Sequence, residues 1–211
     1  EQSFETFSRI VRDVGLSIIG QTANLVPADK KLYALRDVTG TVDNISLIAS
    51  SIMSKKLAAG SDAIVLDVKT GSGAFMKTID ASVKLAEIMV DIGKKAGKRI
   101  VALVTDMNQP LGNAVGNALE VREAIEILSG MHEGDLKAVS LALAARMIFL
   151  SGLSGSVKEA ESMAADALDS GKALASLAAM IEAQGGDPNV TRDTGLLPEA
   201  ASLIPVYAGA S

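Results

Sequence analysis

The stretch AIVLDVKTGSGAFMKTIDASVKLAEIMVDIGKKAGKRIVALVT, residues 63–105, decides the fold class of this chain. Its two ends, residues 63–68 and 100–105, are continuous apolar runs of the kind found inside parallel sheets. Residues 80–96 lie between them and have helical periodicity. Strand, helix and strand at this spacing predict a right-handed βαβ unit. We therefore predict an α/β protein with a parallel or mixed sheet flanked by helices.

Helical periodicity continues on both sides of this unit. The helices expected before it cover residues 4–14, 24–40 and 45–59. Asp43 or Asn44 is the expected N-cap of the last of these. The helices expected after the unit cover residues 117–128, 136–151, 156–171 and 172–184. Two short apolar segments, residues 16–19 and 202–208, are predicted to be strands.

The composition narrows the classes of protein that fit this chain. Its 211 residues are 48% apolar, which indicates a buried core and not disorder. The formal net charge of −5 argues against a nucleic-acid partner. No apolar run reaches the roughly 18 residues that cross a membrane, so we expect no membrane partner. With no cysteine and no secretion signal, we expect a cytoplasmic protein.

The loop after the first strand, residues 70–73, has two interpretations. A G-x-G sequence after a strand can bring the backbone close to a phosphate. However, the dinucleotide fingerprint needs a further glycine where Met76 stands. We therefore expect a tight turn at the carboxyl edge of the sheet, where clefts of α/β proteins form.

Three polar side chains stand out on the predicted helices 24–40 and 45–59. Ser51 and Lys55 are four residues apart, so a helix places them on one face, and Arg36 lies on the preceding helix. A guanidinium, a hydroxyl and an ammonium suit a flat ligand with carbonyl oxygens, such as a pyrimidine base. By spacing alone, a solvated basic face is the simpler explanation of the same residues.

The sequence resembles the pyrimidine-nucleoside phosphorylases, a family that includes thymidine phosphorylase. The resemblance runs from about Phe7 to about Ala208. These enzymes are pentosyltransferases that convert a pyrimidine nucleoside and inorganic phosphate into the free base and a pentose 1-phosphate. The motifs that carry the resemblance are IIGQT at 18–22, PADKKLYALRDVT at 27–39, LIASSIMSKKLAAGSDAIVLDVKTGSGAF at 47–75, DMNQPLG at 106–112 and VGNALEVREAI at 115–125.

The resemblance implies that Arg36, Ser51 and Lys55 bind the base and that Arg36 and Lys55 act in catalysis. The leaving base gathers negative charge, so donors aimed at its carbonyls help most in the transition state. Removing one donor should raise the barrier by about 2–4 kcal/mol.

Three neighbouring charged residues are candidates for a supporting role, namely Asp29, Asp37 and Lys56. Asp29 is explained equally well as an acidic residue in the first turn of a helix. Asp37 follows Arg36 in the sequence and could orient a neighbouring side chain. Lys56 lies about 100° around the helix from Lys55, so it faces either phosphate or solvent.

Leu111, Ala114 and Glu123 match family positions that supply two backbone carbonyls and a carboxylate to a monovalent cation, usually potassium. Oxygen ligands of this kind suit a hard cation. Without the family, Glu123 would be interpreted as an ordinary exposed helix residue. The resemblance implies no organic cofactor, with phosphate as the co-substrate.

The resemblance also implies a division into two lobes across a cleft. Residues 28–58 would belong to a helical lobe, and residues 1–27 and 59–211 to the α/β lobe. The family's Lys-x-Ser and Gly-Gly-Thr-x-Asp region, which holds phosphate, is not found in the sequence. We therefore expect a central fragment of an enzyme that works as a homodimer. Positioning of phosphate can supply about 7–11 kcal/mol, so we expect little turnover from this chain alone.

Two other interpretations stay open. An AMP phosphorylase or an anthranilate-type phosphoribosyltransferase would bind a purine nucleotide, or anthranilate with phosphoribosyl pyrophosphate. A non-catalytic base-binding or dimerisation fragment would bind the base without turnover.

Overall fold

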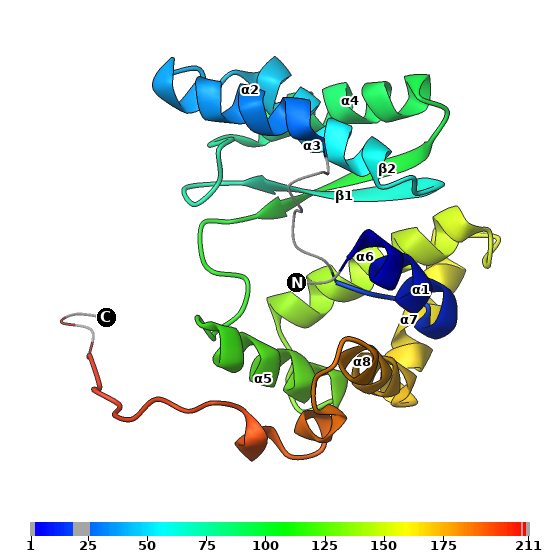
Figure 1. The fold of residues 1–211 in the computed structure, drawn as a ribbon, viewed down its shortest axis with the longest axis vertical. Coiled ribbons are helices and arrows are strands. Elements are labelled where there is room, and N and C mark those ends of the chain that lie inside the picture. The colour runs from blue at the N-terminus through cyan, green and yellow to red at the C-terminus, as the bar shows by residue number, and fades with distance from the viewer. Residues whose placement is uncertain (1–2, 19–25, 208, 210–211) are drawn as a thin grey trace.

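The computed structural model describes residues 3–18, 26–207 and 209. Strands β1 (Ala63–Thr70) and β2 (Arg99–Asp106) form a parallel two-stranded sheet, and helix α4 (Ile79–Lys95) connects them (Figure 1). The register pairs Ala63 with Arg99 and Thr70 with Asp106. The predicted α/β class and both central strands are confirmed.

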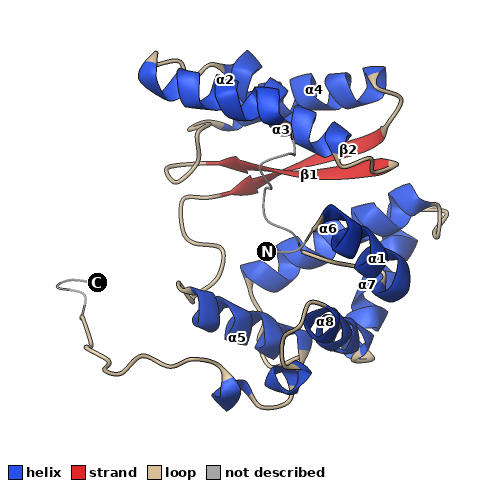
Figure 2. Cartoon of the chain, in the orientation of Figure 1, coloured by secondary structure: helices blue, strands red, loops and turns tan. Residues whose placement is uncertain are grey.

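Helices cover both faces of the sheet (Figure 2). Helices α3 (Ile45–Ala58) and α4 pack on one face, and α6 (Asp135–Ser151) packs on the other. Helix α2 (Pro27–Val38) contacts α3. None of the helices in the described residues is long and apolar enough to cross a bilayer. The remaining helices lie on the α6 side of the sheet, where α7 packs on α6 and α8 contacts α7, α1 and α5. These elements are α1 (Phe4–Val14), α5 (Asn117–Leu128), α7 (Val157–Asp169), α8 (Lys172–Ala183) and two short 3-10 helices beyond α8, Pro188–Thr191 and Thr194–Leu196.

The main core lies between the sheet and the helices α3 and α4. Alternate residues of β1 point into it, because successive side chains of a strand face opposite sides. Burying each large side chain contributes about 1.5–3 kcal/mol. Helix α3 therefore has a firm position on the sheet, while the assignment of residues 28–58 to a separate lobe stays a prediction. The buried apolar residues of this core are Ile48, Ala49, Met53, Ile64, Leu66, Val68, Met76, Leu85, Ala86, Met89 and Ile100.

Local signals set the start of the two helices that matter most for function. Helix α3 begins after Asn44, whose Oδ1 accepts hydrogen bonds from the backbone N–H groups of Ser46 and Leu47, each at 3.1 Å. Asn44 is therefore the N-cap, one of the two predicted residues. Helix α2 begins at Pro27, which suits the first helical position because it needs no N–H partner there.

The glycine loop after β1 is the tight turn expected from the sequence. Gly71 has a φ of 121°, and a Cβ at this position would lie 2.7 Å from Oδ1 of Asn108. That oxygen accepts a hydrogen bond from the backbone N–H of Ser72 at 3.0 Å. The turn therefore ties the carboxyl ends of β1 and β2 together.

The prediction of short strands at residues 16–19 and 202–208 is wrong for the part of each segment that the structure describes. Residues 202–207 run as an extended arm outside the sheet, and residues 16–18 are irregular (Figure 2). Residues 19 and 208 lie outside the described residues. Both segments are apolar, but a strand also needs a neighbour that accepts its backbone hydrogen bonds. The large apolar side chains of the arm are between 83% and 91% exposed, namely Leu203, Ile204, Val206 and Tyr207.

Candidate functional site

Helix α2 turns a polar face towards α3. Asp29, Tyr33 and Arg36 are spaced by four and three residues, so they share that face. Arg36 is the buried residue of the helix. Polar contacts therefore hold α2 in place, because its large apolar side chains, Leu32, Leu35 and Val38, are exposed.

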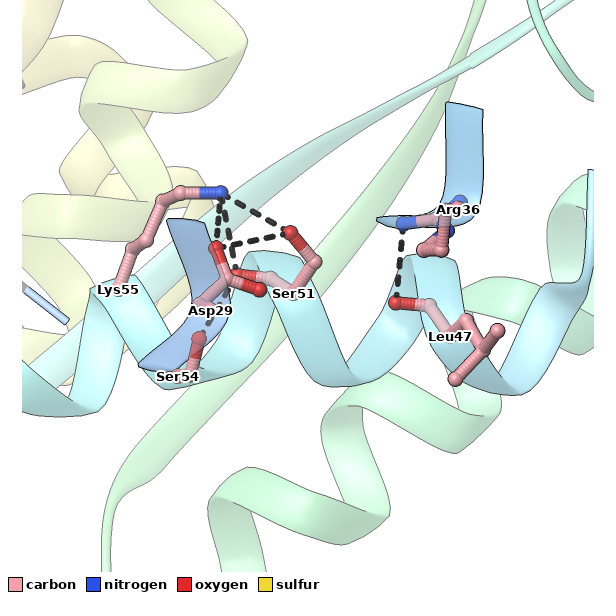
Figure 3. A network of polar contacts seen from close by, with 6 residues as sticks. All are labelled: Asp29, Arg36, Leu47, Ser51, Ser54 and Lys55. Carbon is pink, nitrogen blue, oxygen red and sulfur yellow. Dashed lines mark hydrogen bonds and ion pairs between the residues drawn. The ribbon is translucent and has the colours of Figure 1, made fainter. Parts of the chain in front are cut away.

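Ser51, Lys55 and Asp29 form a compact polar network between the two helices (Figure 3). Nζ of Lys55 lies 2.9 Å from Oδ2 of Asp29 and donates to Oγ of Ser51 at 3.0 Å. Oγ of Ser51 donates to the same Asp29 oxygen at 3.1 Å. The Asp29 side chain is 11% exposed and the Lys55 side chain 30%. The network therefore holds an ammonium group that solvent, or a ligand, can still reach.

The ammonium of Lys55 has one weakly used donor. An ammonium carries three N–H groups, and two of those of Lys55 are directed at Asp29 and Ser51 at short range. The remaining contact is with the backbone carbonyl of Ser51 at 3.4 Å, which is long for a charged hydrogen bond. A carbonyl oxygen of a bound ligand can replace that contact without breaking the network.

Arg36 is not part of this network in the structure. Its guanidinium donates to the backbone carbonyl of Leu47 at 3.4 Å (Figure 3). It also donates to the backbone carbonyl of Val42 and so bridges the turn between α2 and α3. The residue is 6% exposed, and its Nε has no hydrogen-bond partner in the described part of the chain. Of the three residues expected to converge, the structure brings Ser51 and Lys55 together, while Arg36 lies on the same helix pair but bonds elsewhere.

Tyr33 lies beside this network, although the sequence motifs did not single it out. Its ring centroid lies 5.1 Å from Cζ of Arg36 and 5.9 Å from Nζ of Lys55. The available signal was its spacing, four residues after Asp29 and three before Arg36, which places all three on one face of α2.

The other two candidates for a supporting role lie outside the network. Asp37 is exposed on α2. Lys56 is exposed on α3 and lines a separate cavity of about 530 Å³ beside β1, together with Ile52 and Phe75. Lys56 therefore points away from Lys55, as their adjacent positions on a helix require.

The candidate cation residues Leu111, Ala114 and Glu123 line one cavity of about 400 Å³. The Glu123 carboxylate accepts hydrogen bonds from the backbone N–H groups of Asn113 at 2.7 Å and Ala114 at 3.3 Å. These contacts hold the carboxylate against the loop, and its oxygens suit a hard cation. No group of three or more His, Cys, Asp and Glu side chains in the described residues is arranged to hold a metal ion. A cation here would therefore depend on backbone carbonyls as well as on Glu123.

We expect the substitution Gly112→Ala to destabilise this loop. A Cβ at position 112 would lie 2.3 Å from Oε2 of Glu123, so the carboxylate must move and lose its backbone contacts. The free energy of unfolding should fall by about 0.5–1.5 kcal/mol, because the displaced carboxylate loses its backbone hydrogen bonds but reaches water, and urea denaturation measures this difference. Gly155→Ala is the control, because its Cβ would meet only a side-chain atom of Glu159 at 3.5 Å. Equal stability of the two variants would contradict the packing described for Gly112.

A match to a family model and a set of similar proteins both indicate the family of this chain. Residues 1–174 match the family described as "Glycosyl transferase family, a/b domain". The chain is 54% identical over 200 residues to a pyrimidine-nucleoside phosphorylase of Staphylococcus epidermidis, covering 95% of this chain and 46% of the relative. It is 50% identical over 211 residues to the pyrimidine-nucleoside phosphorylase of Staphylococcus haemolyticus, and the match covers 100% of this chain and 49% of the relative.

A pyrimidine-nucleoside phosphorylase of Staphylococcus aureus is 52% identical over 199 residues, covering 94% of this chain and 46% of the relative. The chain spans about half the length of the curated relatives it matches. The family match covers most of the 211 residues and includes α2, α3 and the sheet. The chain belongs to the glycosyl transferase family and carries its α/β domain.

Proposed function

We propose that this chain carries the base-binding residues of a pyrimidine-nucleoside phosphorylase. The whole enzyme would transfer the pentosyl group of a pyrimidine nucleoside to inorganic phosphate and release the free base. The observation that carries the proposal is the Asp29–Ser51–Lys55 network, found in a chain 50–54% identical to enzymes of that name.

The chemistry of the network suits the leaving base. When the glycosidic bond breaks, its electron pair stays on the base, and negative charge spreads to the carbonyl oxygens of the ring. Lys55 would donate to one of these oxygens, and Ser51 would bind the base beside it. Because Asp29 already holds the ammonium, little reorganisation is needed as charge develops.

Arg36 would be the second catalytic donor. Its contact with the Leu47 carbonyl is long, at 3.4 Å, so a terminal nitrogen can be released to a base oxygen at small cost. Its position on the face of α2 that also carries Asp29 supports this role. For the exposed Asp37 and Lys56 we propose no direct contact with the base.

For the whole enzyme we propose four further features, which rest on the resemblance to the pyrimidine-nucleoside phosphorylases. Residues 28–58 would form the helical side of the cleft, opposite the rest of the chain. The carbonyls of Leu111 and Ala114 and the carboxylate of Glu123 would hold a potassium ion between helix α5 and the loop that precedes it. The enzyme would act as a homodimer in the cytoplasm, with phosphate as co-substrate and no organic cofactor.

Ligand selectivity tests the proposed function. We expect the 211-residue chain to bind uracil in a calorimetric or NMR titration that extends to about 10 mM, a range suited to so small a ligand. Adenine and anthranilate should not bind, because their rings lack the paired carbonyls that Lys55 and Arg36 would recognise. The exposed neighbour variant Lys56→Ala should bind uracil as the unchanged chain does. Binding of adenine or anthranilate without uracil would contradict the proposal and favour the related transferases.

A further inference from the structure

A cavity of about 380 Å³ lies between the four helices α5, α6, α7 and α8, and we call it the α5–α8 groove. Helix α6 packs on α7, and α8 contacts both α5 and α7, so the four helices surround the groove. Its floor is closed by Ala164 and Leu168 of α7, which are both buried. The groove lies on the α6 side of the sheet, whereas the α2–α3 pair with the candidate base site lies on the other side (Figure 1).

The walls of the α5–α8 groove are almost entirely apolar. Pockets of about 300–1,000 Å³ with apolar walls and few polar groups are typical binding sites for small molecules. One turn of an α-helix, about 10 Å across and about 5.4 Å long, would need about 420 Å³, so the groove suits a small molecule better than a partner helix. The large side chains of the walls are half-buried, namely Ile127, Leu128, Leu136, Leu141 and Ile148.

Lys137 is the one charged side chain that lines the groove. Its side chain is 17% exposed, and its Nζ lies 2.6 Å from Oε1 of Glu133. Glu133 is 81% exposed, and an ion pair with so exposed a partner contributes little to stability. An ammonium has three N–H groups, and Glu133 is the only partner of Lys137 within the described part of the chain. The ammonium can therefore donate to a second carboxylate.

We propose that the α5–α8 groove binds a small unbranched monocarboxylate, such as hexanoate or octanoate, with its carboxylate on Lys137 and its tail against the apolar walls. Lys137, Leu141, Ala144 and Ile148 follow one another on one face of α6, so the ammonium stands at one end of an apolar stripe. A linear molecule with one anionic end matches this arrangement. A dicarboxylate would place its second charge against apolar walls, which is costly. The inference does not rest on the proposed function.

A series of carboxylates tests the apolar part of the groove. In a calorimetric titration, the 211-residue chain should bind octanoate in a saturable way below about 10 mM. Each methylene group that leaves water raises the affinity by up to about fourfold, so octanoate should bind at least about tenfold more tightly than butyrate.

A substitution of Lys137 tests the charged end. Lys137→Gln should weaken octanoate binding about three- to fivefold, the range expected for a partly exposed ion pair, and should leave the affinity for octanol unchanged. Lys158→Gln is the matched control, because Lys158 is exposed on α7 and does not line the groove. This control variant should bind octanoate as the unchanged chain does.

A substitution of Ala144 tests the position of the tail. Ala144 lines the groove between Leu141 and Ile148, so Ala144→Leu should fill the space and abolish octanoate binding. Ala138→Leu is the control on the same helix, because Ala138 is exposed and does not line the groove. In ¹H–¹³C NMR spectra of the unchanged chain, octanoate should shift the methyl signals of Ile127 and Ile148.

Four results would overturn this inference. The first is no octanoate binding at about 10 mM, and the second is equal binding by Ala144→Leu and the unchanged chain. The third is an equal loss of octanoate and octanol affinity in Lys137→Gln, since the ammonium would then not bind the carboxylate. The fourth is a shift of the Ile127 and Ile148 methyl signals on dilution of the ligand-free chain, which would show that a second copy covers the groove. Because no uracil is used, each result leaves the proposed function unaffected.

Discussion

Replacing Lys55 by methionine is expected to weaken uracil binding about ten- to a hundredfold, because a hydrogen bond to a charged group contributes about 1.5–3 kcal/mol. Methionine retains the length and apolar stem of lysine but has no donor. The measurement is a calorimetric titration with uracil of the unchanged chain and of the Lys55→Met variant.

The control for this experiment removes both charges of the ion pair. In Lys55→Met the Asp29 carboxylate, which is 11% exposed, loses its cation, and the free energy of unfolding should fall by about 1–3 kcal/mol. The double variant Asp29→Asn/Lys55→Met leaves no unpaired charge, so it should regain most of that stability while uracil binding stays weak. Recovery of binding in the double variant would show that the single variant had lost its fold and not its donor.

Replacing Arg36 by alanine is expected to lower the free energy of unfolding by about 2–4 kcal/mol, because two backbone carbonyls lose their donor. The guanidinium donates to Val42 and Leu47, and it is buried where α2 meets α3. Urea denaturation of the unchanged chain and of Arg36→Ala measures this difference.

A matched arginine tests whether the effect belongs to this position. Arg12 is exposed in the last turn of α1, so Arg12→Ala should change the free energy of unfolding by less than about 0.5 kcal/mol. If Arg36→Ala unfolds at the same urea concentration as Arg12→Ala, the bridge between the two helices contributes nothing to stability.

The central fold was predictable because its signals are local. The apolar runs at 63–68 and 100–105 have the length of buried strands, and the segment between them has the length of one crossover helix. The start of α3 was predictable to within one residue, at Asp43 or Asn44, because a cap is made by neighbouring residues, and the structure selects Asn44. The arm at 202–207 was not, because its apolar residues resemble a strand and only tertiary structure decides whether a partner strand exists.

The candidate site was predictable only in part. The shared face of Ser51 and Lys55 follows from helix geometry, and the structure confirms it. The ion pair between Asp29 and Lys55 joins two helices, and the binding of Arg36 to the Val42 carbonyl depends on the turn between them. Such contacts depend on how elements pack, which no periodicity in the sequence specifies.

The cation candidates illustrate the same limit. Leu111, Ala114 and Glu123 were identified from the resemblance alone. Every residue has a backbone carbonyl, so the sequence does not indicate which carbonyls bind a cation. The structure adds that Glu123 contacts the loop through Asn113 and Ala114. That contact needs the conformation of residues 111–114, which only the folded chain defines.

The most direct test of the central claim is to follow the ammonium signal of Lys55 in a ¹H–¹⁵N NMR titration of the unchanged chain with uracil. If Lys55 donates to the base, uracil shifts this resonance, assigned with Lys55→Arg, while the signal of the exposed neighbour Lys56 stays in place. Uracil binding that leaves the Lys55 signal unchanged, or no binding at about 10 mM uracil, would contradict the claim that Lys55 is the base donor.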